Sequence, residues 1–572
     1  MARIFPLDEL ITDEWYPGYD PAQEDSVVAF DRPRTFTKED EAFFWPLDFH
    51  EPRGMVPLAI AIVSEGPGWG SGVAAEAVGL PATRGLRGRF VGPHVYATDV
   101  PVTSAFEIGI RAQRVQSRMP ELIAAFPETW RRRVEELEQW RTLERLDVEG
   151  LDRTGIGAFY EDAMAYSRRA WEIHFEAMYP LAANYVGFQG ICEELGIDPD
   201  RVATFLQGYD SKITESDREL WRLTRLAREH GLEAIFAHAE ARELASILAQ
   251  APAAAAWWRE LEAFLAVWGW RTEGIMDCGL APWIEDPVSV LGTVKTFLQK
   301  RDEHDFETVL ADVVAERERQ IAEARATLTV EEQRTFDAAL ASCRAANFTW
   351  WNEEHNFYID LRAHIPVRRA ALALACLLEI EDPDDIFFVF SYEFRGLCRG
   401  DRDWTDLASL AAERRAWFEA WQPRRPSLPR VVGTLPEGVA DPIVQEIYGM
   451  GRHYFAALEG EGDVERLEGL PAAGGVARGR ARILLTAKDL HAIEPGEILV
   501  CEATSPSWTP AFTKIAACVC DVGGSLTHAS IISREYRIPC VTACAIATTS
   551  IRTGDEIEVD GTNGVVKILS RA

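Results

Sequence analysis

One histidine lies where the chain could bind and carry an anion. In CDVGGSLTHASIISREY (520–536), a buried strand is expected to end at Gly523 and Gly524, and a helix is expected to begin near Thr527. Two glycines allow close approach of a bulky anion, and the first N–H groups of a helix bind anions. A neutral imidazole is a good nucleophile near pH 7. His528 could therefore carry a phosphoryl group held by backbone donors and by Ser525 or Thr527; the alternative is a plain turn with His528 as a helix-cap residue.

The elements that must position His528 form a small C-terminal unit. Short strands are expected over RARILL, EILVCE, AACVCDVG, IPCVTAC and EIEVDGTNGVVKIL, and Asp560–Gly564 in the last segment is typical of a tight hairpin. Helices are expected over AFTKIA and THASIISREY. Residues 470–572 are therefore predicted to be a compact α/β domain with His528 at a helix start.

Three further regions precede this domain. Residues 1–110 are rich in Gly, Pro and aromatics, with strand-like pieces such as Arg89–Val100, and are predicted to be a mixed α/β part. Residues 111–456 show the i, i+3, i+4 apolar spacing of core-facing helices, one of which is expected to start with Ser216 as its N-cap. Residues 457–469 are Gly/Glu-rich and are predicted to be a linker. The predicted fold class is α+β and multidomain: a mostly helical region with a small β-containing N-terminal part, then a C-terminal α/β domain.

Composition argues against several kinds of partner. The 572-residue chain has a formal net charge of -32, which repels nucleic-acid backbones and anionic lipid surfaces, so neither is expected as a partner. The longest apolar stretch, Ala370–Leu378, is far short of the ~20 residues of a spanning helix, and no signal peptide is visible. The ten cysteines lie in apolar surroundings, which favours a reduced, cytoplasmic protein. Cys518 and Cys520 have no metal-ligand spacing around them, so no metal site is predicted in this chain.

The segment around His528 resembles the phosphohistidine signature of the phosphoenolpyruvate-utilising enzymes, which include pyruvate phosphate dikinase, phosphoenolpyruvate synthase and rifampin phosphotransferase. The resemblance covers residues 470–572, including GGVARGRARILL, EPGEILVCEATSPSWTPAF and RTGDEIEVDGTNGVVKI. It implies a domain that swivels, taking phosphate from ATP at one site and delivering it to an acceptor at another. His528 would be the carrier, and Gly523, Gly524, Ser525 and Thr527 would form its loop.

Residues 1–460 resemble, more weakly, the acceptor-binding region of rifampin phosphotransferase-like proteins. The resemblance rests on DFHEPRGMVPL, LQGYDSKIT, WGWRTEGIMDCGLAPWIEDP, EEHNFYIDLRAHIPVRRAAL and EDPDDIFFV. Relatives often read Gly-His-Arg-Gly where this chain has Gly269-Trp270-Arg271-Thr272.

Neither an ATP-grasp domain nor a GxxxxGK[ST] loop is visible, and a phosphoenolpyruvate barrel is not expected. This layout resembles the large subunit of phenylphosphate synthase-type enzymes, which phosphorylate phenols. It implies that ATP, with Mg²⁺, binds a separate ATP-grasp subunit that loads His528. The implied products are an aryl phosphate, AMP and phosphate.

A phenolic acceptor would need a base, because its pKa is about 10 by analogy with Tyr. His355, Glu353 and Glu354 cluster in one short stretch and are the candidates for this base. Asn356 and Asp360, which follow directly, are candidates to orient the acceptor or the base.

Cationic and polar side chains elsewhere could bind the acceptor or the phosphoryl group. Arg271 and Lys212 are candidates to neutralise the transferring phosphoryl oxygens, and His50 is a further polar candidate. The alternatives are that Arg271 is held in a salt bridge by Glu273 or Asp277 and that Lys212 is merely solvated.

Two competing functions remain open at this point. One is a rifampin-type antibiotic phosphotransferase subunit, for which a wide acceptor groove is expected in place of a small aromatic cavity. The other is a phosphocarrier that passes phosphate from His528 to another protein and needs no enclosed acceptor pocket.

Overall fold

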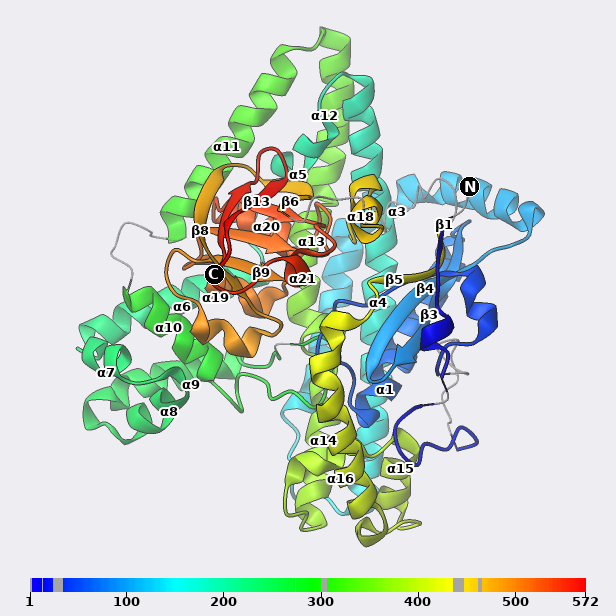
Figure 1. The fold of residues 1–572 in the computed structure, drawn as a ribbon, viewed down its shortest axis with the longest axis vertical. Coiled ribbons are helices and arrows are strands. Elements are labelled where there is room, and N and C mark those ends of the chain that lie inside the picture. Colours follow the sequence, from blue (N-terminus) through cyan, green and yellow to red (C-terminus); the bar gives the residue numbers. More distant parts are fainter. Residues whose placement is uncertain are drawn as a thin grey trace. The chain divides into compact units, whose positions relative to one another are not determined.

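The computed structural model describes residues 3–572 except 13, 24–33, 273, 300–305, 436–446 and 461–464. The predicted α+β multidomain class is confirmed (Figure 1). The chain divides into two compact units. Unit 1 comprises Met1–Pro180, Gly274–Leu280 and Tyr358–Val439, and unit 2 comprises Leu181–Glu273, Ala281–Phe357 and Ala440–Ala572.

The strands of unit 1 form two small antiparallel sheets. Strand β5 (Val431–Leu435) lies between β1 (Arg3–Phe5) and β2 (Phe44–Pro46), so distant parts of the chain share one sheet. The other sheet is the hairpin of β3 (Thr83–Val91) and β4 (His94–Pro101), which confirms the strand pattern expected there. The hairpin turns at Gly92, where φ is 57° and an added Cβ would lie 2.3 Å from the Trp421 ring.

One helix of unit 1 packs closely against the turn that joins two others. Helix α1 (Pro57–Val63) runs through the π-helical turn η3 (Ser64–Gly68) into α2 (Trp69–Val78). Added Cβ atoms at Gly66 and Gly70 would lie 2.7 and 2.5 Å from Trp171 of α4 (Arg153–Glu194). The glycines therefore fix α4 against this turn. The remaining long helices of the unit are α3 (Ala105–Trp140), α14 (Ile365–Leu377), α15 (Ser391–Arg399) and α16 (Trp404–Trp421).

Unit 2 contains a helical subdomain whose core is centred on Trp257, Leu261 and Leu223. This core is built by helices α6 (Lys212–Glu229), α7 (Glu233–His238), α8 (Ala241–Gln250), α9 (Ala255–Trp268) and α10 (Val288–Gln299). Four other helices precede or follow it in the chain: α5 (Val202–Phe205), α11 (Phe306–Ala326), α12 (Val330–Ala345) and α13 (Phe348–His355).

The expected start of α6 at Ser216 is wrong. The helix begins at Lys212, and Ser211 is its N-cap in a capping box with Thr214. Ser216 is fully buried inside the helix, where its Oγ accepts a hydrogen bond from Arg271 at 2.9 Å.

The C-terminal part of unit 2 is an eight-stranded sheet in the order β6-β13-β12-β8-β9-β10-β11-β7. Strands β8 to β11 run parallel, and the pairs outside them are antiparallel. The strands are β6 (Arg466–Glu468), β7 (Leu470–Ala473), β8 (Val476–Ile483), β9 (Ile498–Cys501), β10 (Ala517–Cys520), β11 (Cys540–Thr542), β12 (Glu556–Asp560) and β13 (Val565–Ser570). They confirm the expected strands and the β12–β13 hairpin.

Two of the short helices beside this sheet were predicted from the sequence. Helix α20 (His528–Glu535) confirms the helix expected from Thr527 and packs on the face of the sheet that contains Cys518 and Cys540. Helix α19 (Thr509–Phe512) is shorter and begins earlier than the expected AFTKIA helix. Both faces of the parallel strands are covered, since Val519 and Ala517 lie in a separate core on the other face.

The predicted linker, 457–469, contains regular structure at both ends. It begins in the last turns of α18 (Arg452–Leu458), and its residues 466–468 are strand β6, which pairs with β13. Residues 461–464 lie outside the described part. Across the described residues, none of the helices combines the length and apolar character needed to cross a bilayer.

Candidate functional site

His528 is the first residue of α20, directly after its N-cap Thr527. Its side chain is buried, with 5% of the residue exposed. The ring nitrogen Nδ1 lies 2.8 Å from Thr504 Oγ1, and Nε2 lies 3.2 Å from Thr509 Oγ1. Both threonines follow strand β9, which pairs with β10 ahead of the His528 loop. Sequence reasoning missed them, although they stand in the quoted segment TSPSWTP.

Burial lowers the pKa of His528 to about 3. The ring is therefore neutral near pH 7, and one of its nitrogens carries a lone pair. Because a threonine hydroxyl hydrogen-bonds to each nitrogen, a phosphoryl group on either one must displace a hydroxyl. This is the arrangement of an oriented nucleophile whose reacting atom is covered at rest.

The glycine loop before α20 is held by backbone contacts within unit 2. The N–H groups of Gly523 and Gly524 donate to the carbonyls of Tyr448 and Ile447, at 3.0 and 2.9 Å. Gly523 has a φ of 131°, and an added Cβ there would lie 2.8 Å from Thr527 Oγ1. The two glycines thus serve loop geometry in this structure. Their predicted role as phosphate donors stays a prediction.

The other two predicted loop residues also have partners. Thr527 donates its hydroxyl proton to the Gly524 carbonyl at 2.9 Å. Ser525 Oγ lies 3.3 Å from the Tyr185 hydroxyl, and the Ser525 carbonyl accepts a hydrogen bond from Arg534 at 2.7 Å. The first N–H groups of α20 have no partners within the helix, which keeps an anion-binding capacity beside His528.

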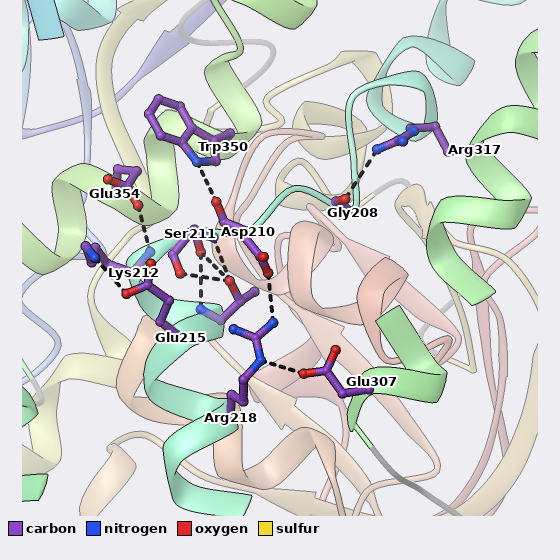
Figure 2. A network of polar contacts seen from close by, with 11 residues as sticks. Gly208, Asp210, Ser211, Lys212, Glu215, Arg218, Glu307, Arg317, Trp350 and Glu354 are labelled. Carbon is purple, nitrogen blue, oxygen red and sulfur yellow. Dashed lines mark hydrogen bonds and ion pairs between the residues drawn. The ribbon is translucent and has the colours of Figure 1, made fainter. Parts of the chain in front are cut away.

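Lys212 lies at the first position of α6 and not in a polar loop (Figure 2). Its backbone N–H donates to Glu354 Oε1 at 2.7 Å, and its ammonium forms an ion pair with Glu215 at 2.6 Å. Burial raises the pKa of Glu354 to about 7. The structure therefore brings together two predicted site residues, Lys212 and Glu354, at one helix start.

The segment before α6 is fixed by a chain of polar contacts in the same view (Figure 2). Trp350 Nε1 donates to the Asp210 carbonyl at 2.8 Å, and the Asp210 carboxylate pairs with Arg218 at 3.0 Å. Arg218 also pairs with Glu307 at 2.5 Å. These contacts tie α6, α11 and α13 together and set where Lys212 begins the helix.

Arg271 and Glu353 belong to a buried acidic cluster that joins the helical subdomain to α20. Arg271 is 2% exposed, and its guanidinium lies 3.8 Å from the centre of the Trp283 ring. Burial and neighbouring carboxylates raise the pKa of Glu353 well above its usual value. Both carboxylate oxygens of Glu353 are buried without a hydrogen-bond partner among the described residues.

The same cluster contains Asp217 of α6 together with Glu535 and Tyr536 at the end of α20. Burial raises the pKa of Asp217 to about 7, against the attraction of Arg271. Burial, followed by the charge of Asp217, raises the pKa of Glu535 to about 7. Arg271 is thus placed among acids; Glu273, one of its expected partners, lies outside the described residues.

His355, the predicted base, is buried in unit 2. Its ring stacks on Trp351 at a centroid distance of 4.1 Å, and Nδ1 lies 3.0 Å from the Trp351 carbonyl. That contact places the proton on Nδ1 and the lone pair on Nε2. Asn356 Nδ2 donates to the Asn352 carbonyl at 2.5 Å, so its amide serves the helix end.

His50 and Asp360, also predicted, lie in unit 1. His50 Nδ1 is 2.8 Å from Asp48 Oδ1; burial opposes protonation, but Asp48 and then Asp360 outweigh it and raise the pKa of His50. Asp360 Oδ1 lies 3.1 Å from Nδ1 of His174. Sequence reasoning missed His174, because it stands 186 positions before Asp360 on a different helix.

Three cysteine sulfurs also converge in the sheet of unit 2. The Sγ atoms of Cys501, Cys518 and Cys520 lie within 4.8 Å of one another and are buried. The register of the parallel strands places Cys520 beside Cys501, a juxtaposition that residue spacing does not reveal. The prediction that this chain holds no metal stays a prediction.

Two family models match the chain where these features lie. Residues 493–564 match the mobile domain of PEP-utilising enzymes, a range that includes His528 and both threonines. Residues 173–353 match the fourth domain of rifampicin phosphotransferase. The predicted resemblance to the phosphoenolpyruvate-utilising enzymes is confirmed over these ranges.

Individual relatives are similar to larger parts of the chain than either family model. The chain is 30% identical to chondramide synthase of Chondromyces crocatus over 98% of its own length and 15% of that protein. It is 29% identical to the uncharacterized phosphotransferase YvkC of Bacillus subtilis over 76% of the chain and 51% of that protein. It is 28% identical to rifampicin phosphotransferase of Bacillus cereus over 54% of the chain and 34% of that protein. The chain thus spans about half or less of the length of each of these relatives.

Proposed function

We propose that this chain is a subunit of a dikinase-type phosphotransferase that passes a phosphoryl group from His528 to the hydroxyl of a phenolic compound. A separate ATP-grasp subunit, binding ATP with Mg²⁺, loads the histidine. The overall reaction is ATP, phenol and water to aryl phosphate, AMP and phosphate. The observation that carries this proposal is the buried, neutral His528 between two threonine hydroxyls, at a helix start inside the matched mobile domain.

The chemistry needs two balanced transfers through His528. In the first, a ring nitrogen bonds to the β-phosphorus of ATP as the bond from that phosphorus to the AMP oxygen breaks, and water releases the γ-phosphoryl group as phosphate. In the second, the acceptor oxygen bonds to phosphorus, the nitrogen–phosphorus bond breaks, and the hydroxyl proton goes to a base. Positioning and charge neutralisation dominate such transfers, which suits the tightly oriented His528 ring.

An aromatic acceptor is supported by a row of aromatic side chains on α4 in unit 1. Trp171, Phe175 and Tyr179 follow one face of the helix, with ring centroids 6.2 Å apart for Trp171–Phe175 and 5.7 Å apart for Phe175–Tyr179. Flat apolar rings of this kind suit a flat apolar ligand. The match of residues 173–353 supports an antibiotic of the rifampicin class as the alternative acceptor.

The test runs the transfer backwards in the purified chain. The chain is incubated with a panel of aryl phosphates and with rifampicin phosphate, without ATP or partner, and acid-labile label is mapped by intact mass and peptide analysis. Label on His528 from one aryl phosphate, absent in His528→Ala and retained in the exposed control His230→Ala, is the expected result.

Other outcomes separate the parts of the proposal. Label from rifampicin phosphate alone would identify the antibiotic acceptor. If no phosphate ester labels the chain while an ATP-grasp partner with ATP still labels His528, the phenol assignment is wrong and a phosphocarrier is favoured.

A further inference from the structure

We propose that His174, oriented by Asp360, is the catalytic base that removes the proton from the acceptor's hydroxyl group. This inference rests on the proposed function and names the group within unit 1 that deprotonates the acceptor. Asp360 is then a positioning residue.

The geometry is that of an oriented histidine. His174 Nδ1 lies 3.1 Å from Asp360 Oδ1, and the two residues are 8% and 5% exposed. An ionised carboxylate accepts hydrogen bonds only, so Nδ1 carries the proton and Nε2 carries the lone pair. Fixing the tautomer and the ring direction in this way is how a carboxylate prepares a histidine to act as a base.

His174 is placed inside the aromatic row of α4. Its ring centroid lies 4.8 Å from Trp171 and 4.8 Å from Phe175. The close packing of Gly66 and Gly70 on Trp171 fixes this part of α4. The inference places the acceptor ring against this row, with its hydroxyl group at the His174 imidazole.

Asp360 lies in a π-helical distortion of the helical backbone. It is the last residue of the π-helical turn η7 (Asn356–Asp360), in which backbone hydrogen bonds span five residues where those of an α-helix span four. Such turns occur often at functional sites because they re-aim a side chain. Here the turn presents the Asp360 carboxylate to a helix almost two hundred residues earlier in the sequence.

Other titratable groups near Asp360 in unit 1 suit the role less well. Burial, followed by Arg368, lowers the pKa of His364 to about 3, which makes it a weak base. His50 has its own carboxylate partner, Asp48, and its raised pKa favours the cation. A cationic His50 suits charge neutralisation better than proton removal.

The step balances without a further reactant. The acceptor's hydroxyl proton moves to His174 Nε2 as the acceptor oxygen bonds to phosphorus. The bond from phosphorus to His528 breaks, and its electron pair returns to the imidazole. In reverse, protonated His174 donates a proton to the departing phenolate while His528 takes the phosphoryl group.

The experiment compares two phosphoryl donors in one variant. Phenyl phosphate releases a basic phenolate that needs a proton, whereas 4-nitrophenyl phosphate releases a stabilised phenolate that does not. The rate of His528 labelling is measured for wild type, His174→Gln and Asp360→Asn, with His528→Ala as the blank. The ratio of the two rates within each variant cancels any loss of folded protein.

We expect His174→Gln to slow labelling from phenyl phosphate by about 10²- to 10⁴-fold and from 4-nitrophenyl phosphate by less than about tenfold. Asp360→Asn should shift the ratio in the same direction by a smaller factor. Equal slowing with both donors in His174→Gln would overturn the inference and leave the proposed function standing. Absence of label from any aryl phosphate in wild type would overturn both together.

Discussion

At the scale of single residues, burial keeps the imidazole of His528 in its neutral form. Water would leave an ordinary imidazole partly protonated below pH 7, but the buried ring has a pKa of about 3 and stays neutral. The direction of this pKa shift determines how fold stability depends on pH. A histidine whose folded pKa is depressed gains a proton more readily when unfolded, so this group stabilises the fold less as the pH falls from about 6.5 to 3.

The two threonines beside His528 should differ in their effect. Thr504→Val removes the 2.8 Å partner of Nδ1 and should slow labelling of His528 about 10- to 100-fold, because the ring loses its orientation. Thr509→Val removes the longer 3.2 Å contact to Nε2 and should change the rate only about threefold. The measurement is the labelling rate by intact mass, with the exposed Thr549→Val as control. Equal loss in both variants would contradict this division of roles.

Sequence could identify His528 but not the residues that hold its ring. The Gly-Gly-Ser-Leu-Thr-His order is local, so the strand end, the helix start near Thr527 and the proposed phosphohistidine could all be predicted from one segment. Thr504 and Thr509 reach His528 only because β9 pairs with β10. The His174–Asp360 contact likewise depends on packing between distant segments. Residue spacing does not reveal such packing.

At the scale of elements, α20 has different chemistry at its two ends. Its first residue is His528, and its last turn places Glu535 beside Asp217 of α6 in the buried acidic cluster. These carboxyls titrate near pH 4 when unfolded and at about 7 when folded. The folded state therefore binds more protons between these values, and the free energy of unfolding falls as the pH rises through this window.

Glu535→Gln should flatten that dependence. The melting temperature of wild type is expected to fall from pH 5 to pH 8, and the variant should lose about 1–3 kcal/mol less stability over the same range. The exposed Glu468→Gln serves as the matched control and should keep the wild-type slope. Identical slopes in Glu535→Gln and wild type would show that the cluster does not retain its protons.

Element boundaries show where local sequence rules compete. Ser211 and Ser216 both have cap-like spacing, five residues apart, and either could begin the helix. The earlier start is stabilised by the Ser211–Thr214 capping box and by Glu354, which accepts the Lys212 N–H from another helix. The strands around β10 were easier to predict, because apolar runs bounded by Gly, Pro and polar residues leave no choice between two starting positions.

At the scale of the whole molecule, the α+β class could be predicted but the path of the chain could not. The helical range 111–456 contributes to both units, which exchange segments at residues 180, 273, 280, 357 and 439. The spacing of apolar residues along a sequence indicates where helices end and strands begin. It does not show which helices pack together, since that depends on contacts across hundreds of residues.

The proposed second, ATP-binding subunit yields a prediction at this scale. The chain incubated with ATP and Mg²⁺ alone should remain unlabelled, and addition of an ATP-grasp partner should label His528 fully, because the proposed loading site lies on the partner. The measurement is the phosphoryl label on the chain, determined by intact mass with and without the partner. Stoichiometric label from ATP in the purified chain, absent from His528→Ala, would contradict the need for a second subunit.

The two hydroxyls on His528 have a further consequence for the resting protein. Imidazole lone pairs ordinarily attract transition metals and electrophilic reagents, and a reactive histidine in an open groove would be exposed to both. Here each ring nitrogen is already engaged and the ring is buried. Under the proposed function, unphosphorylated His528 therefore reacts slowly with such metals and reagents, and a phosphoryl donor must displace a threonine hydroxyl to reach its ring nitrogen.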